Sequence, residues 1–288
     1  MGDQLIRFIS GDSQFRVIAA ETTVLCEKLR RLHGTDPTAT VALGRLATGA
    51  ALLGGLLKGN QRLAIALEAN GPLQKLHAET DAEGHIRASV KCPIAGLPPR
   101  DNRFDVANGI GKAGFLHVIK DLGLKEPYRG MVQLQTSEVG DDIAYYLTHS
   151  EQVPSSVILG ITLDRNAEVG NAGGLMVQAL PGCADELITE LEKRLMKMPS
   201  LSSTLQNGGS IEDLLDDLFF DIECGPSERT ALSFRCSCNR KQVSKILENL
   251  GRQELEEMSA GDEDVDVTCE YCRQTYRFSP ADVSSLIG

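Results

Sequence analysis

Four cysteines near the C-terminal end constrain the fold of this chain more than any other feature of its sequence. One residue separates Cys236 from Cys238, two separate Cys269 from Cys272, and thirty lie between the two pairs. Two close pairs of thiols can bind one tetrahedral ion from two turns, an arrangement typical of zinc sites. The spacing therefore predicts one Zn²⁺ per chain, held by Cys236, Cys238, Cys269 and Cys272.

The residues around these cysteines leave two interpretations open. A closed four-cysteine site is most often a permanent staple, and a domain of about 60 residues needs such support to fold. Four cations flank the pairs, however, and a neighbouring cation favours the reactive thiolate. These cations are Arg235, Arg240, Lys241 and Arg273. Oxidised sulfur ligates zinc poorly, so oxidation would remove the free energy that folds the domain.

Length and composition predict a soluble protein of more than one domain. The chain has 288 residues, of which 42% are hydrophobic and 24% charged, as in ordinary globular proteins. Its net charge is -11 and no segment has a basic surplus, which disfavours a nucleic-acid partner. The first residues lack the pattern of a secretory signal, so we expect a cytoplasmic location, where thiols stay reduced.

The negative charge is concentrated in residues 180–224, which carry three basic and ten acidic side chains. Apolar residues recur there at helical spacing in two stripes. The first comprises Leu187, Ile188, Leu191 and Leu195, and the second Ile211, Leu214, Leu215, Leu218 and Phe219. Pro199 ends the first helix, and Ser210 with Asp213 begins the second in the manner of a capping box. Short acidic helices are marginal in water, so we expect their order to depend on a docking surface.

The residues before this acidic segment predict an α+β domain, because strands and helices alternate without βαβ regularity. We expect antiparallel strands packed with helices. The expected strands cover 15–20, 63–67, 73–79, 86–90, 115–119, 131–135, 156–163 and 175–180, and the expected helices 22–33, 41–57 and 141–148. The segment 41–57 is too short for a bilayer, which needs about 20 apolar residues, and Arg45 interrupts it. We expect a buried core helix and no membrane partner.

No catalytic site is expected. Gly109–Gly114 matches GxGxxG by letter. A dinucleotide site needs a strand before these glycines and a helix after them, and the sequence pattern predicts neither. Residues 92–114 are expected to be mostly loop. His117 and His149 lack triad partners, and the Asp141–Asp142 pair complements a helix dipole. The CxxC pair does not open a helix in a βαβ unit, which disfavours a thiol-disulfide oxidoreductase.

The domain organisation predicted from these features has three parts. They are an N-terminal α+β core domain (1–180), an acidic helical linker (181–225) and a small four-cysteine zinc domain (226–288), with Gly225-Pro226 at the second boundary. The four further cysteines, Cys26, Cys92, Cys183 and Cys224, are expected to be ordinary small apolar residues. Cys224 lies only twelve positions before Cys236, which would allow a mispaired disulfide.

Three segments of the first domain, together with the CxC and CxxC pairs, carry a family resemblance. They are KDLGLKEPYRG (120–130), YYLTHSEQVPSS (145–156) and AGGLMVQ (172–178). In these features, and over almost its whole length, the chain resembles the heat-shock protein 33 family of redox-regulated bacterial holdase chaperones.

The resemblance implies a reduced, zinc-bound, largely inactive monomer. On oxidation, Cys236 would pair with Cys238 and Cys269 with Cys272, zinc would be lost, and the linker and C-terminal domain would unfold. The active form would be a homodimer that holds unfolding client proteins and prevents their aggregation. The alternative from the residues alone is a constitutive zinc-stapled interaction module that does not respond to oxidants.

Overall fold

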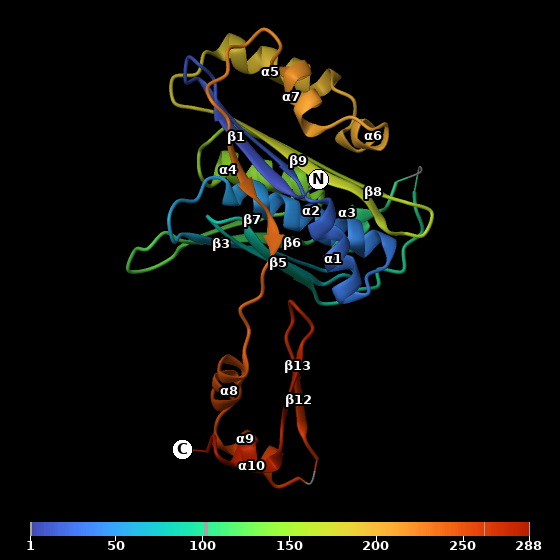
Figure 1. Ribbon diagram of the computed structural model, residues 1–288, viewed down its shortest axis with the longest axis vertical. Helices are drawn as coiled ribbons and strands as arrows, with labels where there is room; N and C mark the ends of the chain where they lie inside the picture. The colour runs from blue at the N-terminus through green and yellow to red at the C-terminus, as the bar shows by residue number, and fades with distance from the viewer. Residues whose placement is uncertain (1, 101–102, 262, 288) are drawn as a thin grey trace. The chain divides into compact units, whose positions relative to one another are not determined.

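The computed structural model describes residues 2–100, 103–261 and 263–287 (Figure 1). It forms two compact units that divide between Phe234 and Arg235. The three-part division expected from the sequence stays a prediction, since the compact units divide the chain only once. The chain is a mixed α+β protein with antiparallel sheets, as predicted.

The first sheet has the strand order β10-β1-β2-β9-β8, and all its pairings are antiparallel. Its strands are β1 (Gln4–Ile9), β2 (Phe15–Glu21), β8 (Ser155–Leu163), β9 (Val169–Ala179) and β10 (Glu228–Ala231). Side chains of β2 are buried on both faces: Phe15 and Val17 belong to one apolar layer and Ile18 to another. Both faces of this sheet are therefore covered by protein.

The second sheet has the order β11-β5-β4-β3-β6-β7. Its strands are β3 (Arg62–Ala69), β4 (Lys75–Asp81), β5 (His85–Val90), β6 (Gly114–Asp121), β7 (Tyr128–Gln133) and β11 (Ser233–Phe234). Strands β3 to β5 form the predicted antiparallel meander, with Leu63, Ile65 and Leu67 buried on one face. The short β11 joins β5 in parallel.

Helices lie between the two sheets of the first unit (Figure 1). They are α1 (Thr23–His33), α2 (Pro37–Gly54) and α4 (Val139–His149). Helix α2 is buried almost throughout, and its Gly44 and Gly49 leave no room for a Cβ beside Ile161 and Ile143. The prediction of a buried core helix is confirmed. Among the described residues, no helix combines the length and apolar character needed to cross a bilayer.

The GxGxxG segment has the opposite context to a phosphate-binding turn. Gly109 and Ile110 end the short helix α3 (Val106–Ile110), and Gly114 begins β6, so a helix precedes the glycines and a strand follows. Gly111 has a φ of 103° and packs against the backbone of Gly71. Apart from the short helix α3 and the first residue of β6, the described residues of 92–114 are mostly loop, as expected; residues 101–102 lie outside the described part.

The acidic segment forms three helices, here called the linker helices: α5 (Asp185–Lys197), α6 (Leu201–Gln206) and α7 (Ile211–Leu218). The helices predicted from the two stripes are confirmed as α5 and α7, while α6 was not predicted. All three cover the outer face of the first sheet (Figure 1). Their apolar layer, separate from the main core, includes Phe219, whose ring stacks on Phe15 with centroids 5.3 Å apart.

Both ends of the linker segment are fastened to the turn between β1 and β2. At one end, Leu180 N donates to Gln14 O and Ala184 N to Gln14 Oε1, each at 2.8 Å. At the other end, Gly11 N donates to Glu223 O at 2.8 Å. The short β1–β2 turn therefore holds the beginning and the end of the linker.

The second unit contains α8 (Arg240–Glu248), α9 (Arg252–Ser259), the antiparallel hairpin β12 (Val265–Thr268) with β13 (Thr275–Phe278), and α10 (Pro280–Ser284). Helix α8 begins two residues after Cys238. The fully buried apolar core is small: Val243, Leu247, Leu255, Phe278 and Val283. A core of this size needs support from another source.

Candidate metal centre

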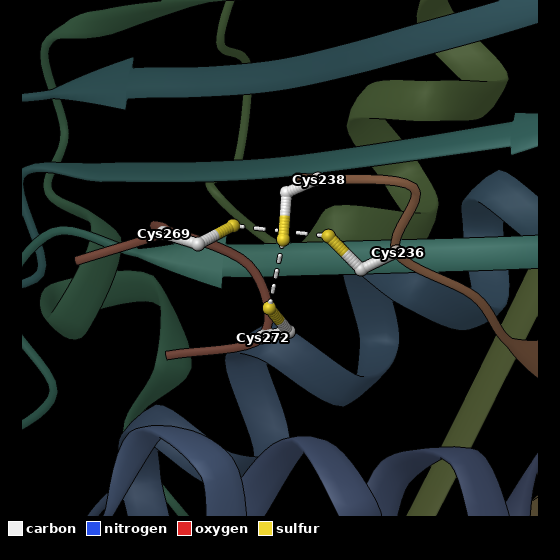
Figure 2. A group of neighbouring side chains, drawn as sticks. All are labelled: Cys236, Cys238, Cys269 and Cys272. Atoms are coloured by element: carbon white, nitrogen blue, oxygen red, sulfur yellow. Dashed lines mark hydrogen bonds between the residues drawn. The ribbon is translucent and has the colours of Figure 1, made fainter. Parts of the chain in front are cut away.

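The four predicted ligands lie together in the second unit (Figure 2). Cys236 and Cys238 come from the loop before α8, and Cys269 and Cys272 from the turn between β12 and β13. Cys236 Sγ lies 3.7 Å from Cys269 Sγ, and Cys238 Sγ lies 3.3 Å from Cys272 Sγ. All four sulfurs lie within 4.8 Å of one another, and no disulfide joins them.

Local backbone structure explains why each pair points inward. On one side, Asn239 caps α8 by accepting a hydrogen bond from Gln242 N at 3.0 Å, which fixes the helix start directly after Cys238. On the other side, Cys269 N donates to Gln274 O at 2.9 Å and Arg273 N donates to Cys269 O at 3.0 Å. Arg273 closes this turn with a φ of 60°, in the left-handed region that glycine adopts most readily.

The arrangement of the sulfurs fits a tetrahedral metal. Zinc–sulfur bonds of about 2.3 Å place thiolates on a tetrahedron about 3.8 Å apart. The contacts of 3.3 and 3.7 Å are close to this spacing. A set of four thiolates also matches the soft donors that zinc accepts in structural sites. Cys236, Cys238, Cys269 and Cys272 can therefore hold one such ion.

The surroundings shift the pKa values of the four thiols in different directions. Burial raises the pKa of Cys236, Cys238 and Cys272 above the ordinary value. Burial acts on Cys269 in the same direction, but backbone N–H groups of Cys272 and Tyr271 donate to its sulfur, and the pKa of Cys269 is lowered. The turn itself therefore favours the thiolate at Cys269, whereas burial disfavours the thiolate at the other three cysteines.

Tyr276 belongs to the site, although it was not predicted. Its hydroxyl on β13 lies 3.2 Å from Cys238 Sγ. Donation to the Cys238 sulfur, together with burial, raises the pKa of Tyr276 to about 12. Hydrogen bonds from such neighbours orient metal ligands and tune their affinity. The available sequence signal was the alternation in 275–278, which places Tyr276 and Phe278 on the same face of a strand.

Arg240, one of the four cations expected to favour the thiolate, has structural partners in the second unit. Its guanidinium donates to Arg277 O at 2.6 Å and to Asp282 at 3.0 Å, and lies 4.3 Å from the centre of the Phe278 ring. A carbonyl, a carboxylate and an aromatic face together satisfy the planar cation, so Arg240 stabilises the fold of the second unit.

The remaining cysteines are dispersed. Cys26 is buried next to Thr22 and Thr48, and burial raises its pKa to about 12, as expected of an inert core thiol. Cys92 and Cys183 are half-buried. Cys224 is exposed, which is unusual for a free cysteine.

The other residues weighed in the sequence have structural partners. His149 Nδ1 lies 3.1 Å from Tyr145 O and its ring stacks on Tyr145. Asp142 is buried, and it accepts hydrogen bonds from Gln135 N at 2.7 Å and Thr136 N at 3.3 Å. Besides complementing the start of α4, Asp142 therefore holds the preceding loop. His117 pairs with Met131 across β6 and β7.

A second group of potential metal ligands, Asp81, Glu83 and His85, lies in the turn between β4 and β5. Asp81 Oδ1 accepts hydrogen bonds from Glu83 N at 3.0 Å and His85 N at 3.1 Å, and Asp81 Oδ2 lies 3.0 Å from His85 Nδ1. These bonds account for the cluster as the framework of a turn.

Comparisons with known proteins agree over the whole chain. The family model described as "Hsp33 protein" matches residues 3–279. The 33 kDa chaperonin of Syntrophotalea carbinolica is 53% identical over 288 residues, covering 100% of both chains. That of Geobacter sulfurreducens is 43% identical over 284 residues, covering 99% of this chain and 94% of the relative. The crystal structure of the 33 kDa chaperonin from Thermotoga maritima superposes with a TM-score of 0.92 at 32% identity, covering 100% and 98% of the two chains.

Proposed function

The chain belongs to the Hsp33 family, and on this premise we propose that it is a redox-regulated holdase, a chaperone that binds unfolding proteins and prevents their aggregation. The observation that carries the proposal is the separate apolar layer beneath the linker helices. It buries Phe15, Val17 and Leu175 of the first sheet against Leu214 and Leu218 of α7. Undocking of the helices would expose apolar surface on both partners.

In the proposed resting state, the four thiolates hold one zinc ion. When bound, the metal supplies folding free energy to a unit whose described residues form a buried core of five apolar side chains. The same thiolates are the groups that an oxidant attacks. Protection by the metal and sensitivity to oxidation therefore reside in the same four atoms.

In the proposed activation, hydrogen peroxide oxidises two pairs of thiols. Each pair of thiolates gives two electrons to one peroxide molecule, which takes two protons from the solvent, so that one disulfide and two water molecules form. The pairs Cys236–Cys238 and Cys269–Cys272 follow the family resemblance; all four sulfurs lie close enough to allow other pairings. A disulfide no longer supplies thiolate ligands, so the second unit loses its source of stability.

Release of the linker follows from its marginal stability. Residues 180–224 carry seven more acidic than basic side chains, and the linker helices are short. Such helices are stable only while docked. The exposed apolar surfaces would then bind clients and a second activated chain, giving a homodimer in the cytoplasm. The proposed role is binding, with no catalytic step.

The decisive experiment follows aggregation of a thermally unfolding client by light scattering, with zinc release measured in parallel by a chromogenic chelator. We expect peroxide-treated protein to release zinc and suppress aggregation, and reduced protein to do neither. Equal protection by both forms would exclude redox control. Zinc retained under mild oxidant, with an intact second unit, would favour the constitutive interaction module instead.

Two cysteine variants sharpen this experiment. Cys269→Ser removes a ligand, so it should weaken zinc binding and increase proteolysis of residues 181–225 even under reducing conditions. Cys92→Ser removes a half-buried thiol of the first unit and should leave both unchanged. Unchanged protease resistance of the linker in Cys269→Ser would show that the stability of the linker does not depend on the metal centre, which would contradict the proposed coupling.

A further inference from the structure

A cleft of about 490 Å³ opens in the first unit at the end of the β1–β2 hairpin. Three separate segments form its walls: the hairpin (residues 7–16), the turn after α2 (55–58) and the chain that leads from the linker into β10 (225–228). Its size lies within the range of about 300–1,000 Å³ that is usual for small-molecule sites. No part of the metal centre contributes to it.

Three cations line this cleft, and one carboxylate opposes them. Arg7 is satisfied, since it forms an ion pair with Glu228 and donates to Gly55 O at 3.1 Å. Arg16 is half-buried, and no hydrogen bond or ion pair reaches its guanidinium from the described residues. The Lys58 ammonium likewise has no ion pair within the described part of the chain. The half-buried Arg16 and the exposed Lys58 therefore present two positive charges to this cleft.

The register of the hairpin places the two arginines together. Arg7 pairs with Ile18 and Arg16 with Ile9 across the antiparallel strands β1 and β2. Arg7 and Arg16 are therefore diagonal neighbours on the same face. Burial, with the added repulsion of Arg7, lowers the pKa of Arg16. Half-burial of an unpaired cation beside a like charge is unfavourable, and an anion in the cleft would offset this cost.

We propose that this cleft binds the phosphate group of a small phosphorylated molecule. The planar fork of Arg16 suits bidentate contact with an oxyanion, and Lys58 adds a second positive charge that favours a dianion. Ser13 also lines the cleft, and its hydroxyl can serve as a further donor. Ile9, Leu56 and Pro226 give the cavity an apolar wall, which suits the organic part of a phosphate ester.

The test uses isothermal titration calorimetry on the full-length, reduced, zinc-loaded protein at constant ionic strength. Inorganic phosphate, pyrophosphate and ADP are the probes, with sodium chloride as the ionic control. We expect saturable binding of at least one phosphate probe at a single site. Tighter binding of ADP than of phosphate would show that the apolar wall contributes to affinity. Equal affinities would show that the site recognises only the phosphate group.

Two matched variants locate the site. Arg16→Gln should weaken binding at least about tenfold, because it removes a charge-assisted bidentate contact. Arg165→Gln makes the same change on the exposed β8–β9 turn and should alter affinity less than about twofold. Zinc content and circular dichroism of both variants verify their folding. Absence of saturable binding by all three probes, or equal losses in the two variants, would overturn the proposal.

Discussion

Tyr276 shows how one side chain outside the cysteine set can control the metal centre. Its hydroxyl lies 3.2 Å from Cys238 Sγ, in the half of the site where burial raises the pKa of the thiol. A hydrogen bond from this hydroxyl to the Cys238 thiolate offsets part of the rise in pKa that burial causes. The hydroxyl should therefore favour the ligand form of Cys238 over the protonated thiol.

Replacement of Tyr276 by phenylalanine tests this role. Tyr276→Phe keeps the ring and removes the donor, so zinc affinity should fall by about 10-fold, in the range usual for loss of a ligand's hydrogen-bond partner. Competition with a chromogenic chelator measures the change in the reduced protein. Tyr145→Phe, on α4 of the first unit, is the matched control and should leave zinc affinity unchanged. Identical affinities in the two variants would exclude the contribution of Tyr276.

At the residue scale, the sequence predicted the part of the site that is local. CxC and CxxC are each formed within a few residues, so their spacing alone indicates two halves of one site. Tyr276 reaches Cys238 only because the β12–β13 hairpin folds beside the loop before α8. The contacts of Arg240 could not be predicted for the same reason, since its partners Arg277 and Asp282 are distant in sequence.

At the scale of elements, two glycines of the first sheet leave the space in which α6 packs against the sheet. Gly160 on β8 pairs with Gly173 on β9. A Cβ on Gly160 would lie 2.9 Å from the backbone nitrogen of Ser202 at the start of α6. A Cβ on Gly173 would lie 2.8 Å from Ala20 O and 3.1 Å from Ile211 Cδ1 of α7. The smallest residue is therefore needed where the linker helices approach the sheet.

Gly160→Ala should loosen the linker while the metal centre stays intact. Overpacking against a backbone atom typically costs about 1–3 kcal/mol, so hydrogen-exchange protection of α6 should fall by about tenfold or more. Gly170→Ala lies in the same hairpin, where the nearest atom is 3.3 Å from the added Cβ, and should have little effect. Full zinc content and unchanged protection of α2 would show that the rest of the chain is folded. Equal hydrogen-exchange protection of α6 in the two variants would contradict the requirement for glycine at position 160.

Long apolar or strongly periodic elements were predictable, and short polar ones were not. Helix α2, strand β2 and helices α5 and α7 carry their signal in their own residues. Strand β10, with the sequence ERTA, is mostly exposed and exists because β1 offers an edge. Strand β7 begins at Tyr128 rather than 131, since its exposed first residues show no alternation. Tertiary pairing, rather than local preference, forms these elements.

At the scale of the whole molecule, the two units differ in how they are stabilised. The first buries a large apolar core between its sheets, and the second buries five apolar side chains fully. Stability rises with buried apolar area, so the second unit should depend on its metal and the first should not.

Removal of the metal should therefore unfold the chain selectively. A strong chelator under reducing conditions should abolish hydrogen-exchange protection in α8 and in β12–β13, while α2 and β3 stay protected. Addition of zinc should restore the protection. The same chelator at saturating zinc is the control for direct effects of the reagent. Persistent protection of α8 and β12–β13 in metal-free protein would show that the small core suffices.

Strand β10 should delay the proposed activation. It lies between the linker and the second unit along the chain, and four residue pairs join it to β1. Loss of structure after Arg235 therefore leaves the end of the linker attached until β10 separates from β1. We expect client binding to lag behind metal loss, and a reductant that arrives within this lag would return the chain to its resting state before any client is captured. Strand β10 would thus filter out brief exposures to oxidant.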